Sequence, residues 1–300
     1  MRRHFVLMQK NSSCCKESLH TCIFLYIMEG KKMFGKGDAM YLLEKQRTAA
    51  IKEGIRQIDL AYPVFVDAVM DGFIQGNLYV DDAMHPRIYF LETACGIYYV
   101  AGKREEELSH CSAFIVDVYE RQKRQNGRFT VFSANQLTDV MMKKYLGSHL
   151  NEMERHAYIF SEVHSYVPAS HSGYRVERTN EQVIKASKAF TPSYYEAYWG
   201  RAARFLSKGI GVAILDGEDV VSECVSIFSS EDRVEIDIWK EEACRGKGLA
   251  QLAGQHMIRS CLENKRTPHW DCDVQHLTSI KLAEKLGFQR TKTYRLFYSS

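Results

Sequence analysis

The segment WKEEACRGKGLAQLAGQHMIRSC, from Trp239 to Cys261, places a charged turn with two glycines directly between a strand-like run and a helix-like run. Glycine allows backbone conformations and close approaches that other side chains obstruct, and the first amides of a helix have no partner within it. These amides and the helix dipole favour a bound anion. Arg245 and Lys247 add positive charge. The turn predicts an anion-binding loop that could hold a pyrophosphate; a solvated strand-to-helix turn is the alternative.

The run after this turn supports a helix that packs on a sheet. Its apolar residues fall on one helical face. They are Leu249, Leu252, Ala253, Met257 and Cys261. Polar residues lie on another face, so the start of the helix is expected to face a ligand.

The C-terminal part alternates between strand and helix patterns. We expect a strand at Tyr174–Glu177, helices at Glu181–Ala189 and Thr191–Ser207, three strands within residues 211–240 joined by turns at DGED and SSED, a helix at Leu249–Glu263, a strand at HWDCDV, a helix at Thr278–Leu286 and a terminal strand at TKTYRLFY. This order predicts a mixed sheet flanked by helices.

The preceding part has an α+β pattern without a phosphate-binding loop. We expect helices at Tyr41–Ile58, Pro63–Ile74 and Asn135–Tyr145, and strands in GNLYVDD, RIYFLET, CGIYYVAGK, RFTVFS and HAYIFSEV. Pro168 and Gly173 interrupt the pattern, which places a domain boundary there. The predicted organisation is an extension over residues 1–38, either disordered or a start-site artefact, a smaller α+β domain over 39–165, and a second domain over 171–300.

Composition restricts the partners. A net charge of +3, from 40 basic and 37 acidic residues, gives no strong field for nucleic acid or a membrane surface. The longest apolar run near the start, CIFLYIM, is too short to span a bilayer. Nine cysteines without paired spacing are typical of reduced thiols in the cytoplasm. Cys14, Cys15, His20 and Cys22 lack the spacing of a zinc site, so no metal is expected.

Three motifs together carry a family resemblance. They are R-x-x-G-x-A at Arg245–Ala250 after a strand, WDC at Trp270–Cys272, and SIKLAEKLGF at Ser279–Phe288. They resemble the acetyl-CoA loop and following elements of the GNAT acetyltransferase superfamily, in the branch of zwittermicin-resistance-like acetyltransferases. The resemblance implies an α/β (α+β) fold whose C-terminal half is a mixed, splayed sheet, with acetyl-CoA in the splay as co-substrate and a primary amine as acceptor.

The resemblance also assigns cofactor-binding residues. Backbone groups of Ile238, Trp239 and Lys240 would contact the pantetheine arm, and Arg245 opens the phosphate loop. The loop amides that would contact the phosphates belong to Gly246, Lys247, Gly248, Leu249 and Ala250. The family's usual asparagine and tyrosine in the helix before L-G-F are replaced here by His276 and Ala283, so the usual general acid is missing.

Candidate catalytic residues lie on the strand before the loop. Strand alternation in RVEIDIW puts Glu235 and Asp237 on one face, where they could bind a cationic amine and pass its proton to water. A solvent-facing acidic strand is the alternative. The family resemblance favours Glu235. His256, His269 and His276 are alternative acids or bases, although single histidines are more often structural.

An aromatic cluster at Tyr194, Tyr195, Tyr198 and Trp199 could line an acceptor pocket or complete the core, and we favour the core. Together, the sequence predicts an acetyl-CoA-dependent N-acetyltransferase that moves an acetyl group directly to a primary amine of a small molecule. A non-catalytic acyl-CoA-binding or protein-interaction module is the alternative, and a homodimer is left open.

Overall fold

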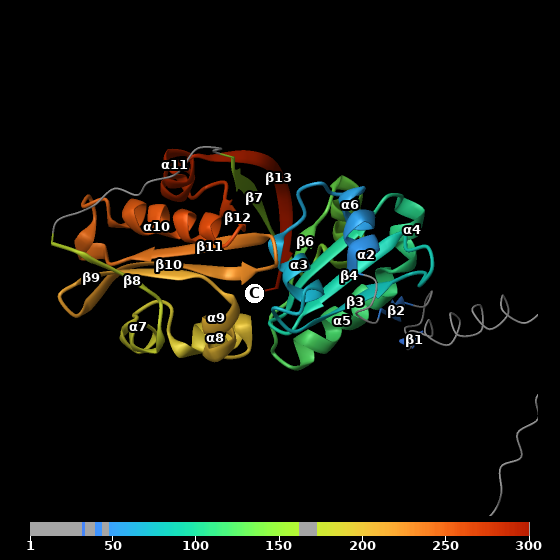
Figure 1. Ribbon diagram of the computed structural model, residues 1–300. Coiled ribbons are helices and arrows are strands. Elements are labelled where there is room, and N and C mark those ends of the chain that lie inside the picture. Colours follow the sequence, from blue (N-terminus) through green and yellow to red (C-terminus); the bar gives the residue numbers. More distant parts are fainter. Residues whose placement is uncertain (1–31, 34–39, 44–47, 162–172, 300) are drawn as a thin grey trace, which may run out of the picture.

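The computed structural model describes residues 32–33, 40–43, 48–161 and 173–299, and its strands form one continuous 13-stranded sheet (Figure 1). The strand order is β1-β2-β3-β4-β5-β6-β13-β7-β12-β11-β10-β9-β8. Apart from residues 32–33, the expected N-terminal extension lies outside the described residues.

Residues before 161 build the first half of the sheet. The strands are β1 (Lys32–Met33), β2 (Met40–Leu42), β3 (Gly76–Val80), β4 (Ile88–Thr93), β5 (Ile97–Gly102), β6 (Thr130–Ser133) and β7 (Asn151–Phe160). The helices are α2 (Thr48–Arg56), α3 (Val64–Met70), α4 (Glu105–His110), α5 (Ser112–Arg124) and α6 (Gln136–Leu146). Neighbours from β1 to β5 are antiparallel, whereas β5 and β6 are parallel.

Residues after 173 build the second half. The strands are β8 (Arg175–Arg178), β9 (Gly211–Asp216), β10 (Asp219–Ser229), β11 (Arg233–Lys240), β12 (Thr267–Asp273) and β13 (Phe288–Tyr298). The helices are α7 (Glu181–Ala186), α8 (Pro192–Trp199), α9 (Ala202–Lys208), α10 (Leu249–Glu263) and α11 (Leu277–Lys285), with a 3₁₀ turn at Glu242–Cys244. Strands β8 to β11 are antiparallel, and β11 and β12 are parallel.

The two halves repeat one order of elements. Each has short helices, three antiparallel strands, a helical connection, a parallel strand, a helix and a last strand, so β3 to β7 correspond to β9 to β13. The last strands are exchanged: β7 pairs with β12, and β13 pairs with β6. The exchanged strands also pair with each other along their length, from Phe288 opposite Phe160 to Tyr298 opposite Asn151. Each half therefore completes its sheet with a strand from the other.

The exchange bears on the predicted boundary between residues 165 and 171. That boundary falls between β7 and β8, within residues that the structure leaves undescribed. It assigns β7 to the first domain, although β7 pairs with β12 of the second. The division into two domains stays a prediction, and neither predicted domain contains all strands of its own sheet.

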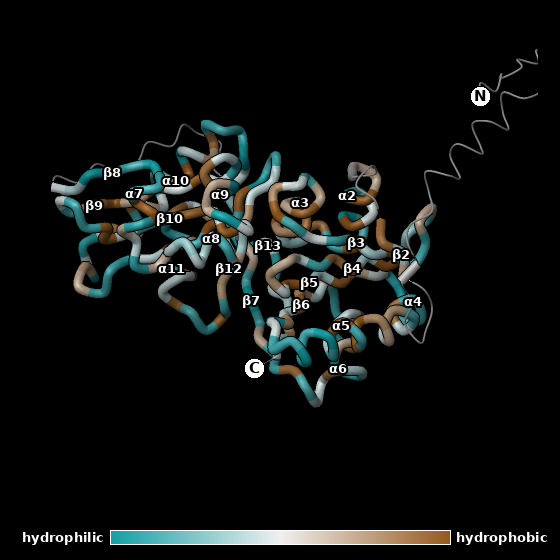
Figure 2. Tube along the Cα trace, turned by 90° about the horizontal axis from the view of Figure 1, so that it is seen from below, coloured by the Kyte–Doolittle hydropathy of each residue, from teal (hydrophilic) through white to brown (hydrophobic). Residues whose placement is uncertain are grey.

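Apolar clusters lie on both faces of the sheet. In the second half, α10 and α11 cover one face and α7, α8 and α9 the other (Figure 1). A central cluster joins both halves through α3 and α8, with Phe65, Trp199 and Phe228 buried in it. A second cluster lies under α10, and a third lies under α5 and α6. Figure 2 shows the corresponding brown, apolar stretches along strands such as β10 and β4.

Several expected elements differ from the structure. The helix expected at Tyr41–Ile58 is only α2, because residues 40–42 pair as a strand with β3. The helix expected at Thr191–Ser207 is two helices, since Gly200 has a φ of +76° and ends α8. The sequence reading also missed α4 and α5. By contrast, α10 has its predicted bounds.

Two expectations from composition, on membrane spans and on cysteines, can be compared with the described residues. Within the described ranges, no helix is long and apolar enough to cross a membrane. The cysteines that the structure describes carry free thiols, and most of them are buried.

Candidate active site

The turn after β11 has the backbone geometry expected of an anion-binding loop. Gly246 and Gly248 adopt φ values of +80° and +74°, which only glycine adopts without strain. A Cβ on Gly246 would meet no atom within 4 Å, so its requirement is conformational and the space beside it is open. The turn is exposed.

Helix α10 begins at this turn with unpaired amides. Gly248 is its N-cap and has no side chain to cap it. The amide of Leu252 donates to the Gly248 carbonyl at 3.0 Å, so the amides of Leu249, Ala250 and Gln251 precede the first intrahelical bond. No acidic residue lies in the first turn. This helix start therefore presents donors and a positive dipole end to solvent.

The two basic residues of the turn are also exposed. The Arg245 guanidinium lies 2.9 Å from the Glu242 carboxylate, and both side chains are more than two-thirds exposed. The Tyr174 hydroxyl contacts the Lys247 ammonium and raises the pKa of Lys247. Both cations border the free amides.

Strands β11 and β12 separate beside this turn. They pair from Arg233 opposite Thr267 to Ile236 opposite Trp270, and not beyond. The rest of β11 pairs only with β10, and the rest of β12 only with β7. Ile238, Trp239 and Lys240 lie on the stretch of β11 that pairs with β10 but not with β12. The predicted splay is therefore present in the structure.

The two predicted carboxylates lie on the same face of β11. Their neighbours Val234 and Ile236 are buried in the cluster under α10, on the other face. Asp237 accepts a hydrogen bond from the Tyr194 hydroxyl at 2.9 Å. Burial raises the pKa of Asp237, and the Tyr194 hydroxyl and the Ile238 amide lower it. Asp237 is thus held by its neighbours.

Glu235 has a different environment. It lines a cavity of about 600 Å³ and lies one residue before the last pair between β11 and β12, Ile236 opposite Trp270. Burial raises the pKa of Glu235 well above its usual range, the nearby Asp271 carboxylate raises it further, and Arg155 and Arg233 oppose the shift. A carboxyl group with a raised pKa beside a cavity suits a general base near neutral pH.

A polar cluster that sequence reasoning missed surrounds Glu235. Arg155 of β7 forms an ion pair with Asp271 of β12. The Tyr294 hydroxyl of β13 donates to the other oxygen of Asp271 at 2.7 Å. Burial raises the pKa of Asp271, and Arg155 lowers it. Asp271 stands in the WDC motif, but its partners could not be found without knowing that β7 and β13 are exchanged.

The structure separates the three candidate histidines. His276 is the exposed N-cap residue of α11 and does not line the cavity. His256 lies on α10. His269 does line the cavity; burial lowers its pKa to about 3, and its Nε2 atom has no hydrogen-bond partner. Ala283 is fully buried in the cluster under α10, so nothing at that position can donate a proton.

The aromatic residues on α8 were expected either to complete the core or to line an acceptor pocket. Tyr195 and Trp199 are fully buried in the central cluster, as favoured for the core. Tyr194 packs there too, but its hydroxyl holds Asp237. One residue of the cluster therefore touches the candidate site.

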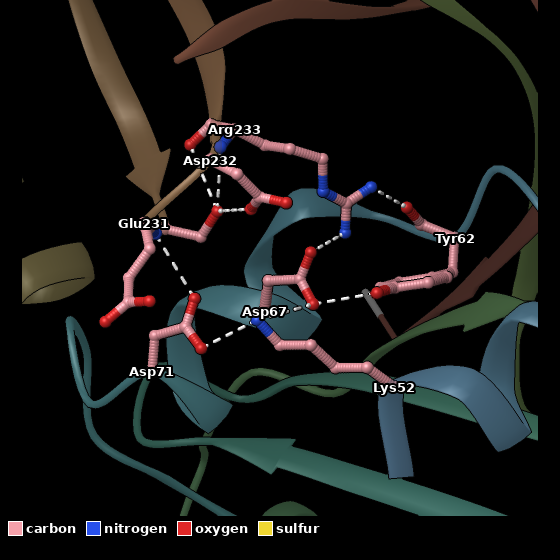
Figure 3. A network of polar contacts seen from close by, with 8 residues as sticks. Lys52, Tyr62, Asp67, Asp71, Glu231, Asp232 and Arg233 are labelled. Carbon is pink, nitrogen blue, oxygen red and sulfur yellow. Dashed lines mark hydrogen bonds and ion pairs between the residues drawn. The ribbon is translucent and has the colours of Figure 1, made fainter. Parts of the chain in front are cut away.

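A polar network connects the start of β11 to the first half of the chain (Figure 3). The Arg233 guanidinium forms an ion pair with buried Asp67 of α3 and donates to the Tyr62 carbonyl at 3.0 Å. Lys52 of α2 lies 2.7 Å from Asp71, whose other oxygen accepts from the Glu231 amide. The network fixes α3 against the strand that carries Glu235.

No metal site accompanies these groups in the described ranges, where no three His, Cys, Asp or Glu side chains are placed to hold an ion.

Comparisons with known proteins identify the family of the chain. A family model described as GNAT acetyltransferase matches residues 55–297. The uncharacterized N-acetyltransferase YdfB of Bacillus subtilis (strain 168) is 40% identical over 244 residues, which cover 79% of this chain and 90% of that protein.

Solved structures share the fold. A GCN5-related N-acetyltransferase-like protein of Streptococcus suis 89/1591 has a TM-score of 0.62 at 20% identity, covering 85% of this chain and 99% of that one. A tandem GNAT protein from the clavulanic acid biosynthesis pathway has a TM-score of 0.54 at 11% identity, covering 87% and 97%. The narrower zwittermicin-resistance-like branch stays a prediction. The family match and the 40% identical relative show that the chain belongs to the GNAT acetyltransferase family and is a GNAT-type N-acetyltransferase.

Proposed function

We propose that the protein transfers an acetyl group from acetyl-CoA directly to a primary amine of a small molecule. The observation that carries this proposal is that β11 joins two features at neighbouring positions. Its C-terminal end leads into an open turn followed by free helix-start amides, and Glu235 lines a cavity one residue before β11 makes its last pair with β12. A thioester donor and an amine acceptor need these two environments side by side.

The residues of the turn and splay fit acetyl-CoA. A pyrophosphate requires closely spaced donors and positive charge, which the amides of Gly246, Gly248, Leu249 and Ala250, with the side chains of Arg245 and Lys247, would provide. The Lys247 amide itself already donates to the Cys244 carbonyl at 3.4 Å. An extended pantetheine arm requires unpaired backbone groups, which Ile238–Lys240 would offer where β12 has left β11. Bound there, acetyl-CoA supplies an acetyl group whose C–S bond breaks as the new amide C–N bond forms.

Within this proposal, Glu235 accepts, through water, the proton that the amine loses. Arg155, through its ion pair, and the Tyr294 hydroxyl, through its hydrogen bond, hold the Asp271 carboxylate near Glu235. Asp237 tunes the charge of the same face. His276, exposed at the start of α11, has no role in this step. A thiol has an ordinary pKa of about 8.5, so water can protonate the departing thiolate although position 283 is alanine.

The test is a screen of primary amines with acetyl-CoA, reading both thiol release and the mass of the acetylated amine. We expect at least one small amine to be acetylated with matching thiol release. Calorimetry on the same protein measures acetyl-CoA binding separately. Binding without turnover on any amine would overturn the proposal in favour of the non-catalytic acyl-CoA-binding module, which the family match does not favour.

A further inference from the structure

The cavity beside Glu235 has one wall that comes wholly from the first half of the chain. Residues 58–64, from the loop after α2 to the first residue of α3, form this wall, and strands β7, β11, β12 and β13, from both halves, form the other. Because the first half of the chain supplies an entire wall, it shapes what can reach Glu235.

The wall from the first half is fixed at two points. Asp59 accepts hydrogen bonds from the Lys292 ammonium at 2.6 Å, the Tyr99 hydroxyl at 3.1 Å and the Ala61 amide at 3.2 Å. Tyr62 accepts from Arg233 through its carbonyl and donates from its hydroxyl to Asp67 at 2.8 Å. A loop held by backbone and side chain at both points gives a preformed cavity rather than an adaptable one.

The cations around the cavity are already paired. Lys292 pairs with Asp59, and Arg233 pairs with Asp67. Among the described residues that line the cavity, no cation is left without a carboxylate. His269 is neutral because burial lowers its pKa. The cavity therefore offers nothing to balance a carboxylate or phosphate on a ligand, and burying an unbalanced anion is costly.

The exposed lining of the cavity is mostly apolar. Leu60, Pro63 and Ile159 are among the apolar residues that line it, and the Leu60 side chain is 85% exposed at the wall. Glu235 and His269 are among the polar residues of the lining, and the His269 Nε2 atom has no hydrogen-bond partner among the described residues. An exposed leucine beside a cavity that also contains polar groups suits a ligand with an apolar body and one polar end.

We propose that this cavity binds the acceptor as a primary amine on an apolar or aromatic body that carries no anionic group. The amine lies toward Glu235, and the body lies against the wall of residues 58–64. This inference rests on the proposed function and narrows its substrate class: amino acids and phosphorylated amines are excluded, whereas arylalkyl and alkyl amines are accepted.

The first experiment compares 2-phenylethylamine with phenylalanine, which differs from it by one carboxylate, and with ethanolamine, which lacks the apolar body. We expect kcat/KM for 2-phenylethylamine to exceed that for phenylalanine about 100-fold, because the carboxylate would be buried without a partner. We expect it to exceed that for ethanolamine about 10-fold. Equal use of the three amines would leave the acetyltransferase proposal standing and overturn this inference.

The second experiment tests the wall with Leu60→Ser, and Leu262→Ser on α10 is the matched control. Leu60→Ser should raise KM for 2-phenylethylamine about 5-fold, because apolar contact is lost, with KM for acetyl-CoA unchanged. Leu262→Ser should change neither. An unchanged KM in Leu60→Ser would contradict the assigned wall.

If no amine is acetylated, the proposed function fails, and binding decides the inference. Calorimetry then measures 2-phenylethylamine on the wild-type protein and on Leu60→Ser. Binding that Leu60→Ser weakens supports the cavity as an apolar amine site. No binding by the wild-type protein, or equal binding by the two proteins, overturns it.

Discussion

The two halves of the sheet differ at corresponding positions, where the third antiparallel strand of each half leads into a helix. In the second half, β11 leads to Gly246, Gly248 and a helix start without acidic residues. In the first half, β5 leads to α4, whose first turn contains Glu105, Glu106 and Glu107. Acidic side chains at a helix start interact favourably with its dipole and repel a phosphate. The same order of elements therefore has a helix start without acidic side chains in the second half and an acidic helix start in the first.

The strands next to these turns differ in the same sense. Four residues of β11 extend beyond its pairing with β12, whereas β6 pairs with β5 as far as Ser133 opposite Val100. The Asn135 side chain then donates to the Gly102 carbonyl at 3.0 Å and closes the end of β5. The first half thus lacks the opening that the second half keeps.

The inward faces of the two strands complete the comparison. Facing the central cluster, β5 carries Ile97, Tyr99 and Ala101, all buried. On the corresponding face, β11 carries Arg233, Glu235 and Asp237. This face of β5 packs in the core, whereas the corresponding face of β11 carries ionisable side chains. The first half therefore contributes to the candidate site through residues 58–64 and β7, which line the cavity, and through Asp67 of α3, which pairs with Arg233.

The largest expected effect comes from removing the carboxylate that distinguishes β11 from β5. Glu235→Gln keeps the side-chain shape but cannot accept a proton, so kcat should fall about 100-fold. Affinity for acetyl-CoA should change little. Asp237→Asn is the control, because Asp237 is held by the Tyr194 hydroxyl, and its effect should be smaller. A nearly normal Glu235→Gln with a severely impaired Asp237→Asn would move the base two residues along the strand.

The same substitution has consequences for pH. Burial and Asp271 raise the pKa of Glu235, so the base form increases as the pH rises, and wild-type turnover should rise with it. Glu235 is protonated in the folded state and ionised in the unfolded state between its usual pKa and its raised one. The folded state binds more protons there, so the free energy of unfolding should fall as the pH rises through this range. Urea unfolding of Glu235→Gln should show a weaker fall.

The second expected effect concerns the turn. Gly248→Val places a β-branched residue at a φ of +74° and should lower acetyl-CoA affinity about 30-fold, because the amides at the start of α10 are displaced. Gly217→Val is the matched control, since Gly217 also has a positive φ, of +60°, but lies in the β9–β10 turn. Calorimetry on both proteins should also give one acetyl-CoA per chain. Equal affinities in the two variants would remove the turn from the site, and a stoichiometry of two would break the comparison between the halves.

Several features of the second half could be predicted because their signals are local, although the break between α8 and α9 at Gly200 was missed. The glycines of the turn, the face of α10 and the alternation of Glu235 and Asp237 depend on residues close along the chain. The partners of Asp271 were not predictable, because Arg155 and Tyr294 reach it through the exchange of β7 and β13. The cavity wall of residues 58–64 was missed for a similar reason: a contact between distant segments leaves no pattern in one sequence. The repeat of the two halves could not be recognised in the sequence, because the halves share the order of their elements but only the second has the glycine-containing turn.

The smallest expected effect tests the closure of the first half. Asn135 caps α6, accepting from the Thr138 amide at 3.1 Å, and also bridges to Gly102. Asn180 caps α7, accepting from the amides of Gln182 and Val183 at 2.9 Å, without such a bridge. Asn180→Ala should therefore lower the free energy of unfolding by about 1 kcal/mol, and Asn135→Ala by about 2 kcal/mol, as measured by urea unfolding. Equal losses would mean that the bridge adds nothing to the closure. Asn135→Ala should still bind one acetyl-CoA per chain, because the acidic start of α4 remains; a second molecule bound would show that the Asn135 bridge alone keeps the first half closed.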